Sequence, residues 1–232
     1  MAGMATHVIT GAGSGIGAAV ARRLHERGDD LVLHARDAGR AKELAAAFPG
    51  ARTLVGDLSE PDRLSWAFSH QTLPDRVDSL LHIAGVVDLG PVGELTPKNW
   101  HHQLDVNLIA PAELTRHLLP QLRAAHGHVV FVNSGAGLNA HAEWSAYAAS
   151  KHGLKALADA LREEEHGNGV RVTSVYPGRT ASPMQAKIHH QEGKPYDPSR
   201  WIDPESVATA ILTSLDLPKD AEINDLTVRP GR

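Results

Sequence analysis

The sequence predicts an α/β fold, a doubly wound parallel sheet of about seven strands with helices on both faces. Three observations support this prediction. Short apolar runs rich in β-branched residues alternate with longer segments rich in Ala, Leu, Arg and Glu. A glycine-rich turn separates the first apolar run from the first helical segment. No internal repeat or low-complexity linker interrupts the alternation.

The expected strands cover residues 7–10, 30–34, 52–55, 79–83, 128–132 and 170–175, with 226–228 as a weaker last candidate. The expected helices cover residues 16–26, 38–47, 61–70, 97–125, 145–165 and 204–215, and several open on Asp, Ser, Thr or Pro. Strands that alternate with helices imply a parallel sheet covered on both faces. One long loop is expected, at about residues 179–203.

Length and composition fit a single domain over residues 1–232, with 42% hydrophobic and 22% charged residues. The formal net charge is −4 and no basic run occurs, so we expect no nucleic-acid partner. The chain has no cysteine, which excludes disulfides and thiolate metal sites. The first residues lead directly into a predicted strand and no apolar run reaches membrane-spanning length. We therefore expect a soluble, cytoplasmic protein with no membrane partner.

The glycine-rich turn is Thr10-Gly-Ala-Gly-Ser-Gly-Ile-Gly17. Glycine at this junction permits a tight turn and close approach of the backbone to a pyrophosphate, and the amino end of the following helix favours the anion. Three residues separate Gly11 from Gly15, which departs from the common Gly-x-Gly-x-x-Gly spacing. Taken alone, such a turn also fits a structural connection, a methyltransferase or a flavin protein.

A tyrosine and a lysine stand four residues apart in Ser145-Ala-Tyr-Ala-Ala-Ser-Lys151. On a helix this spacing places both side chains on one face, so the Lys151 ammonium lies near the Tyr147 phenol. A nearby cation favours the phenolate, so we expect a lowered Tyr147 pKa and a role in proton transfer. The alternative is an ordinary helix face with an amphipathic Tyr and a solvated Lys.

The ordered set of motifs resembles the short-chain dehydrogenase/reductase family over nearly the whole chain. The resemblance rests on the glycine-rich pattern followed by Asn107, Ser134, Tyr147 and Lys151. Three further elements fall where the family has adenine, sheet-supporting and nicotinamide-side elements, namely Asp57-Leu58, Ala84-Gly85 and Pro177-Gly178. One departure is His82-Ile83, where members commonly carry two asparagines, and it weakens a supporting element.

The resemblance implies a Rossmann fold and hydride transfer between a nicotinamide nucleotide and a carbonyl or secondary alcohol. Tyr147 would be the general acid/base, and Lys151 would lower its pKa and bond the nicotinamide ribose. Ser134 would bond the substrate oxygen, and Asn107 would support a water-linked proton path to Lys151. Taken singly, Ser134 is more simply a cap or turn residue and Asn107 a helix residue that bonds backbone.

Cofactor choice depends on the end of the second strand, where the chain has Ala35-Arg36. NAD-preferring members tend to carry Asp at the position of Ala35, whereas an Arg accommodates a 2′-phosphate. We therefore expect NADP(H) over NAD(H). Against this stand Asp37, which could repel a phosphate, and Ser14, where some relatives carry a second basic residue. The alternative is that Arg36 is a solvated residue at a helix start.

The resemblance also places a hydroxyl, Ser182, where relatives bond the nicotinamide carboxamide, with Thr180 as the alternative donor or either residue closing a turn. Substrate contacts are expected from the loop 179–203. The full cofactor-binding set is Gly11, Ser14, Gly15, Ile16, Gly17, Ala35, Arg36, Asp57, Leu58, Ala84, Gly85, Tyr147, Lys151, Pro177, Gly178, Thr180 and Ser182.

Fifteen histidines raise the question of a metal, but none has a recognised ligand spacing, so no catalytic metal is expected. Family resemblance alone implies a homodimer or homotetramer built on the helices 97–125 and 145–165. One further functional alternative is a dinucleotide-binding sensor or partner protein without turnover. Another, a methyltransferase, leaves the Tyr147 and Lys151 pair unexplained.

Overall fold

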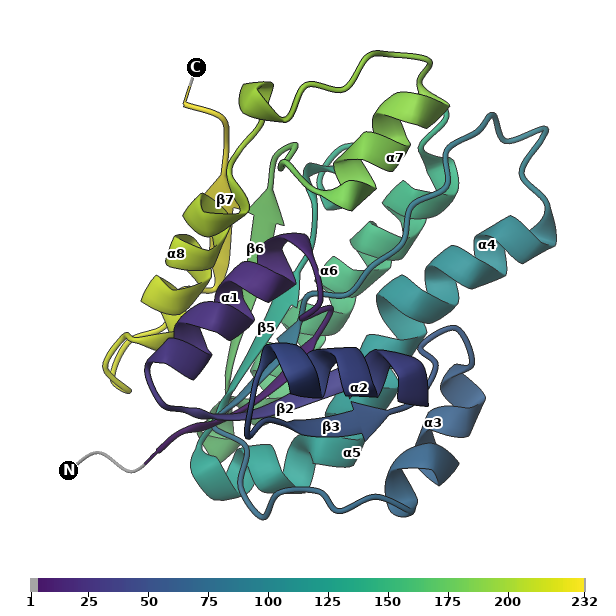
Figure 1. Ribbon diagram of the computed structural model, residues 1–232. Helices are drawn as coiled ribbons and strands as arrows, with labels where there is room; N and C mark the ends of the chain where they lie inside the picture. The colour runs from purple at the N-terminus through teal and green to yellow at the C-terminus, as the bar shows by residue number, and fades with distance from the viewer. Residues whose placement is uncertain (1–3, 232) are drawn as a thin grey trace.

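Seven parallel strands form one sheet in the computed structural model, which describes residues 4–231 (Figure 1). The strands are β1 (Thr6–Thr10), β2 (Asp30–Ala35), β3 (Arg52–Val55), β4 (Ser79–His82), β5 (His128–Val132), β6 (Arg171–Pro177) and β7 (Asp225–Val228). Their order across the sheet is β3-β2-β1-β4-β5-β6-β7. The predicted fold class is confirmed, and the chain reverses its direction of winding between β1 and β4.

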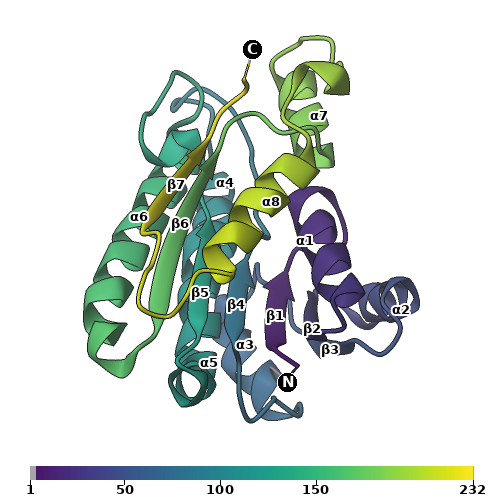
Figure 2. The same ribbon diagram turned by 90° about the vertical axis from the view of Figure 1, so that its left-hand side faces the viewer.

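Helices cover both faces of the sheet (Figure 2). They are α1 (Gly15–Glu26), α2 (Ala38–Ala47), α3 (Pro61–Ser69), α4 (Pro97–Leu104), α5 (Ala110–Ala125), α6 (Ser145–Glu165), α7 (Pro183–Gln191) and α8 (Pro204–Leu215). Within residues 4–231, no helix is both long and apolar enough to cross a bilayer.

Alternation along the strands creates two hydrophobic cores. In β1, Val8 points to the face covered by α3, α5 and α6, whereas Ile9 points to the face covered by α1, α2 and α8. Leu80 and Leu81 of β4 divide in the same way. Successive side chains of a strand point to opposite faces, so these strands need apolar residues at nearly every position.

Two expectations about the elements are wrong in detail. The single helix predicted over 97–125 is interrupted by a π-helical segment, Asp105–Ile109, between α4 and α5. The predicted loop 179–203 contains α7, which begins after Ser182, whose hydroxyl oxygen accepts a hydrogen bond from the Gln185 backbone N–H at 3.2 Å. Pro183 at the first helical position also favours a start here.

Candidate active site

Two adjoining cavities open at the carboxyl edge of the sheet. The larger, of about 690 Å³, is lined by the ends of β1, β4, β5 and β6 and by parts of α6 and α7. The smaller, of about 590 Å³, lies over the ends of β2 and β3 and the start of α2. Gly11, Ser14, Ala84 and Gly85 line both cavities. An extended ligand can therefore run across the winding reversal, where open α/β sheets bind dinucleotides.

The glycine-rich turn fits a pyrophosphate. Gly11 has φ +76°, and a Cβ there would lie 2.8 Å from the Ala84 backbone N. A Cβ at Gly17 would lie 2.1 Å from the Gly11 carbonyl oxygen, so no other residue fits. Ser14 precedes α1 without a side-chain capping bond. The first N–H groups of α1 are therefore available to an anion, and Gly15 and Ile16 line the larger cavity beside them.

Arg36 lies at the rim of the smaller cavity with 77% of its side chain exposed, and its Nε donates to Asp37 Oδ2 at 3.0 Å. Asp37 caps α2 by accepting from the Arg40 backbone N–H at 2.8 Å. The bond from Arg40, with that from Arg36, holds the Asp37 pKa below its usual value. Ala35 is buried and lines neither cavity. The position therefore has no acid that could bond a ribose hydroxyl, and Ala35 itself does not contact the cavities.

Arg40 is a candidate binding residue that sequence reasoning missed. Its guanidinium covers the glycine-rich turn, because a Cβ at Gly13 would lie 1.6 Å from Arg40 Nη2. Arg40 lines the smaller cavity with Arg36 and also pairs with Glu43. The only sequence signal is that a second arginine follows Arg36 by four residues.

The predicted adenine-side pair also lines the smaller cavity. Asp57 Oδ1 accepts from both the backbone N–H and the hydroxyl of Ser59, each at 2.8 Å. Leu58 is 8% exposed and belongs to the hydrophobic core below α3. The two bonds to Asp57 thereby fix this turn, and Leu58 packs into the core beside the cavity.

Ser134, Tyr147 and Lys151 meet in the larger cavity. Tyr147 and Lys151 are both buried, on adjacent turns of α6. Lys151 Nζ donates to the Val132 carbonyl at 3.0 Å and lies 5.9 Å from the centroid of the Tyr147 ring. Trp144 packs edge-on against Tyr147 with ring centroids 5.8 Å apart. The structure thus brings three of the four predicted catalytic residues to one place.

The expected lowering of the Tyr147 pKa is wrong for this geometry. Burial raises the pKa of Tyr147, and a hydrogen bond with Ser134 acts in the opposite direction. Burial also lowers the pKa of Lys151 to about 8. Removal from water disfavours the charged form of both groups, and this effect exceeds any stabilisation of the phenolate by the amine. Tyr147 is therefore held in its protonated form at neutral pH.

Asn107 lies in the π-helical segment and lines neither cavity. Its Oδ1 accepts from the Val86 N–H at 2.8 Å, and its Nδ2 donates to the Val86 carbonyl at 2.9 Å and to Ser150 Oγ at 3.0 Å. The side chain is thus committed to the segment after β4. It lies near Lys151, since a Cβ at Gly85 would be 3.2 Å from Asn107 Oδ1 and 3.7 Å from Lys151 Nζ. Its part in a proton path stays a prediction.

Asn133 is a second residue that sequence reasoning missed. Its Oδ1 accepts from the Ser134 N–H at 2.9 Å, and its Nδ2 donates to the Lys151 carbonyl at 3.0 Å. The buried amide therefore joins the end of β5 to α6 and sets the separation of two site residues. Ser134 itself caps a short 3₁₀ turn, with Oγ accepting from the Ala136 N–H at 3.1 Å. No sequence pattern marked Asn133 beyond its place next to Ser134.

The departure at His82-Ile83 does not leave the segment after β4 loose. Thr10 Oγ1 accepts from the backbone N–H groups of Ile83 and Ala84 at 3.0 and 3.1 Å. His82 is buried, stacks on Phe131 with centroids 4.9 Å apart, and bonds Thr115 Oγ1 at 2.9 Å. Burial lowers its pKa to about 3, so it is neutral.

The predicted nicotinamide-side residues also line the larger cavity, namely Pro177, Gly178, Thr180 and Ser182. Thr180 Oγ1 donates to the Gly178 carbonyl at 3.0 Å, so this hydroxyl closes a turn. Ser182 caps α7 and faces the glycine-rich turn, since a Cβ at Gly15 would lie 3.2 Å from Ser182 Cβ. On the same cavity, Met184 and Ile188 of α7 form an apolar wall with Trp144. Among residues 4–231, no group of three or more His, Asp or Glu side chains is placed to hold a metal.

Comparison with known proteins agrees with this site. Residues 5–193 match the family model of short chain dehydrogenase. Dehydrogenase/reductase SDR family member 11 of Bos taurus is 32% identical, with 96% of this chain and 94% of that protein aligned. The alcohol dehydrogenase of Thermococcus sibiricus, complexed with 5-hydroxy-NADP, is 25% identical with a TM-score of 0.81 over 97% of this chain and 96% of that one. A 4-hydroxyisoleucine dehydrogenase complexed with NADH and succinate is 25% identical, with a TM-score of 0.82 over 97% and 98%.

Proposed function

The chain belongs to the short-chain dehydrogenase/reductase family, and from that premise we propose that it is an NADP(H)-dependent enzyme that interconverts a carbonyl group and a secondary alcohol. One observation carries the proposal. Ser134, Tyr147 and Lys151 converge in a cavity that continues into a glycine-rich turn shaped for a pyrophosphate. When bound, the nicotinamide nucleotide supplies or accepts the hydride, and the residues of the chain handle the substrate oxygen and its proton.

Tyr147 and Ser134 are the two hydroxyls that would hold the substrate oxygen. They line the same cavity, and the Ser134 hydroxyl opposes the rise in the Tyr147 pKa that burial causes. Because burial keeps Tyr147 protonated, it can give its proton to the oxygen of a carbonyl during reduction. Oxidation needs the phenolate, so the oxidative rate should rise toward alkaline pH while the reductive rate does not. In this proposal the buried amine of Lys151, 5.9 Å from the centroid of the Tyr147 ring, assists the loss and return of that proton.

Tyr147→Phe tests this proposal with a matched control. The variant removes one hydroxyl from the site, and we expect turnover of a carbonyl panel to fall by about 10² to 10⁴, the usual contribution of a positioned acid. NADPH affinity should stay within about threefold of the original, because the ring is retained. Tyr176→Phe also removes one buried tyrosine hydroxyl, but Tyr176 lies in β6 and lines neither cavity. This control variant should retain turnover. Full activity of Tyr147→Phe would contradict the acid/base role and favour a non-catalytic sensor.

Preference for NADP(H) is supported by charge at the smaller cavity. Arg36 and Arg40 both line it, and no acid occupies position 35. Asp37, the acid expected to repel a phosphate, is engaged as a helix cap and as a partner of Arg36. A 2′-phosphate would meet two guanidinium groups, which bind phosphate through paired N–H donors.

Nucleotide titration of Arg36→Ala and Arg40→Ala tests the preference. We expect the Kd of NADPH to rise about 10-fold or more in each variant, because each loses a charge-assisted bond to the phosphate. The Kd of NADH should change by less than about twofold, because NADH lacks that phosphate. Arg22→Ala removes an exposed charge that pairs with Glu205 outside the linings of both cavities, and it serves as the control. Equal losses for both nucleotides would argue against a phosphate site.

Assembly into a homodimer or homotetramer through α4, α5 and α6 and a cytoplasmic location stay predictions. Light scattering at micromolar concentration decides the first, and a stable monomer would remove it.

A further inference from the structure

Arg229, the residue that follows β7, lines the larger cavity. β7 pairs in parallel with β6, and β6 with β5, so the carboxyl ends of these three strands lie side by side (Figure 2). The Arg229 guanidinium rests against Gly135, where a Cβ would lie 2.8 Å from Nη1. Gly135 directly follows Ser134, so a residue near the end of the chain lies beside the hydroxyl proposed to hold the reacting oxygen.

The backbone on either side of Arg229 is held in place. The Gly178 N–H donates to the Val228 carbonyl at 2.7 Å. A Cβ at Gly178 would lie 3.1 Å from Pro230 Cδ, so the chain packs closely against the end of β6. The base of the Arg229 side chain is therefore fixed by strand pairing, and its long stem carries the guanidinium across to Gly135.

The charges around the larger cavity do not balance. Its lining contains the basic residues Lys151, Arg179 and Arg229 but a single acid, Glu192. Glu192 is already paired with Arg179, because Arg179 Nη1 donates to Glu192 Oε2 at 3.0 Å. The Arg179 guanidinium also lies over two tryptophan rings. Within residues 4–231, no carboxylate forms an ion pair with Arg229. An arginine does not lose its proton in proteins, so the exposed Arg229 side chain carries a permanent positive charge at the edge of the cavity.

We propose that the substrate carries a carboxylate that Arg229 binds, so that the enzyme acts on an oxo acid or the matching hydroxy acid. This rests on the proposed function, because the reacting oxygen is taken to sit at Ser134 and Tyr147. A guanidinium binds a carboxylate through two parallel N–H···O bonds and so fixes its orientation as well as its position. The carbon chain between the two ends would lie along the apolar wall of Trp144, Met184 and Ile188.

A keto acid and its neutral methyl ester test the proposal. Levulinic acid (4-oxopentanoic acid) carries a carboxylate at neutral pH, and methyl levulinate has the same ketone without the charge. We expect the purified protein to prefer the acid in kcat/KM, and Arg229→Gln to lower the acid-to-ester ratio about 10- to 100-fold, the size of a charge-assisted pair. Arg63→Gln removes the same charge on α3, outside the lining of the larger cavity, and should leave the ratio unchanged. An unchanged ratio in Arg229→Gln overturns the proposal.

Gly135→Ala tests the same contact without touching Arg229. The added methyl would meet Nη1 at 2.8 Å and displace the guanidinium, while the backbone at Gly135 is outside the left-handed region and accepts alanine. We expect a smaller fall in the acid-to-ester ratio than in Arg229→Gln. Arg229→Lys keeps the charge but loses the two-pronged geometry, so it should fall between the original protein and Arg229→Gln.

A binding measurement separates failure of this proposal from failure of the proposed function. Calorimetric titration of the NADPH-loaded protein with succinate does not depend on turnover. Weaker succinate binding in Arg229→Gln, at unchanged NADPH affinity, supports the anion site even if no carbonyl in a panel is reduced. Equal succinate binding in both proteins overturns the site even if carbonyls are reduced. A comparable loss of NADPH affinity in Arg229→Gln would assign Arg229 to the cofactor and also overturn it.

Discussion

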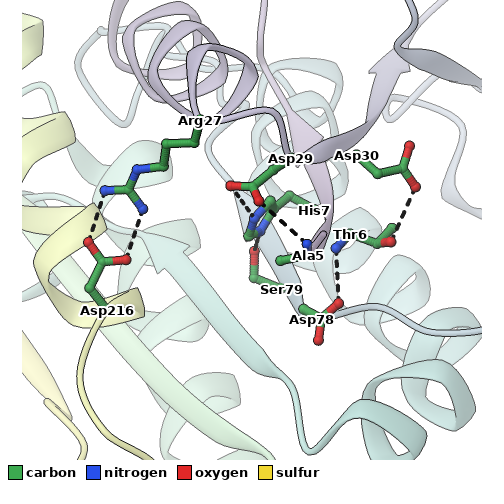
Figure 3. Close-up of polar contacts among 9 residues, drawn as sticks. All are labelled: Ala5, Thr6, His7, Arg27, Asp29, Asp30, Asp78, Ser79 and Asp216. Atoms are coloured by element: carbon green, nitrogen blue, oxygen red, sulfur yellow. Dashed lines mark hydrogen bonds and ion pairs between the residues drawn. The ribbon is translucent and has the colours of Figure 1, made fainter. Parts of the chain in front are cut away.

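At the amino end of the sheet His7 stands between Ser79 and Asp29, whereas at the carboxyl end Tyr147 shares a cavity with Ser134 and Lys151 (Figure 3 shows the amino end). His7 Nδ1 lies 2.7 Å from Ser79 Oγ, and Nε2 lies 3.4 Å from Asp29 Oδ2. Each end therefore combines a hydroxyl with titratable side chains on neighbouring elements. By residue type alone, the amino end has the Ser, His and Asp of a hydrolase triad.

The two ends differ in what surrounds the polar groups. Ser79 is 1% exposed and lines neither cavity, and the neighbouring Asp78 accepts the Thr6 N–H at 2.9 Å. Nearby, Arg27 pairs with Asp216 at 2.8 Å and ties α1 to the end of α8 (Figure 3). At the amino end polar groups join strands to one another, whereas at the carboxyl end Ser134, Tyr147 and Lys151 line a cavity. Access to a cavity, and not the residue types, separates a site from a structural cluster.

Lys151→Met should show the largest effect and sharpen this contrast. Loss of the amine should reduce turnover at least about 100-fold, because the proton transfer proposed for Tyr147 loses its neighbouring amine. Stability should increase. Burial lowers the Lys151 pKa from 10.5 to about 8, so the unfolded chain binds this proton more tightly than the folded protein does. The resulting loss of folding stability is fully present below pH 8 and disappears as the pH rises to 10.5. We expect a gain of about 1–3 kcal/mol at pH 7 in urea unfolding.

A control for this prediction lies at the other end of the molecule. His7→Leu removes a buried titratable group whose loss should leave kcat within about twofold, since it touches neither cavity. A Lys151→Met protein that kept turnover, or one less stable than the original at pH 7, would contradict the prediction. Lys151 would then stabilise the fold, as the polar groups at the amino end do.

The sequence predicted the carboxyl end well because its parts are local patterns. The glycine-rich turn, the Tyr147 and Lys151 spacing and the alternation of elements all depend on residues close in the chain, where helix and strand geometry fixes what faces what. Ser134 and Asn107 entered only through family resemblance, and the position of Asn107 away from the cavities could not be read from the motif.

The missed residues are those whose roles depend on contacts between distant segments. Arg229 reaches Gly135 only because β7 pairs beside β6, and Asn133 matters because it bonds the backbone of α6. The Tyr147 pKa was predicted in the wrong direction for a related reason. Spacing reveals a charged neighbour but not the burial of both groups, and here burial has the larger effect.

Acid should destabilise the fold because of buried histidines. We expect this effect to be smaller than that of Lys151→Met and larger than that of Ser79→Ala. Burial lowers the pKa of His82 and of His128 from 6.5 to about 3. Between these values the unfolded chain binds protons that the folded protein does not, so stability is present above pH 6.5 and is lost as pH falls toward 3. Each histidine should contribute up to about 1.4 kcal/mol per pH unit in this window.

Urea unfolding at several pH values between 7 and 5 measures this slope. His128→Leu should flatten it, because one of the buried histidines that resist protonation is gone, while His82 and other buried histidines continue to contribute. The same slope in His128→Leu and in the original protein would mean that folding does not lower the His128 pKa, and the amino end would then not be the closed structural region described above.

Ser79→Ala should have the smallest effect and most directly tests the contrast between the two ends. The change removes the partner of His7 Nδ1, so we expect a loss of about 1 kcal/mol, the net value of one hydrogen bond, in urea unfolding at pH 7. Turnover should be unchanged, and a fluorophosphonate probe should label neither protein, because Ser79 is buried and no cavity reaches it. Labelling of the original protein that disappears in Ser79→Ala would mean that the amino end opens and reacts, and burial would then fail as the criterion that distinguishes the two ends of the sheet.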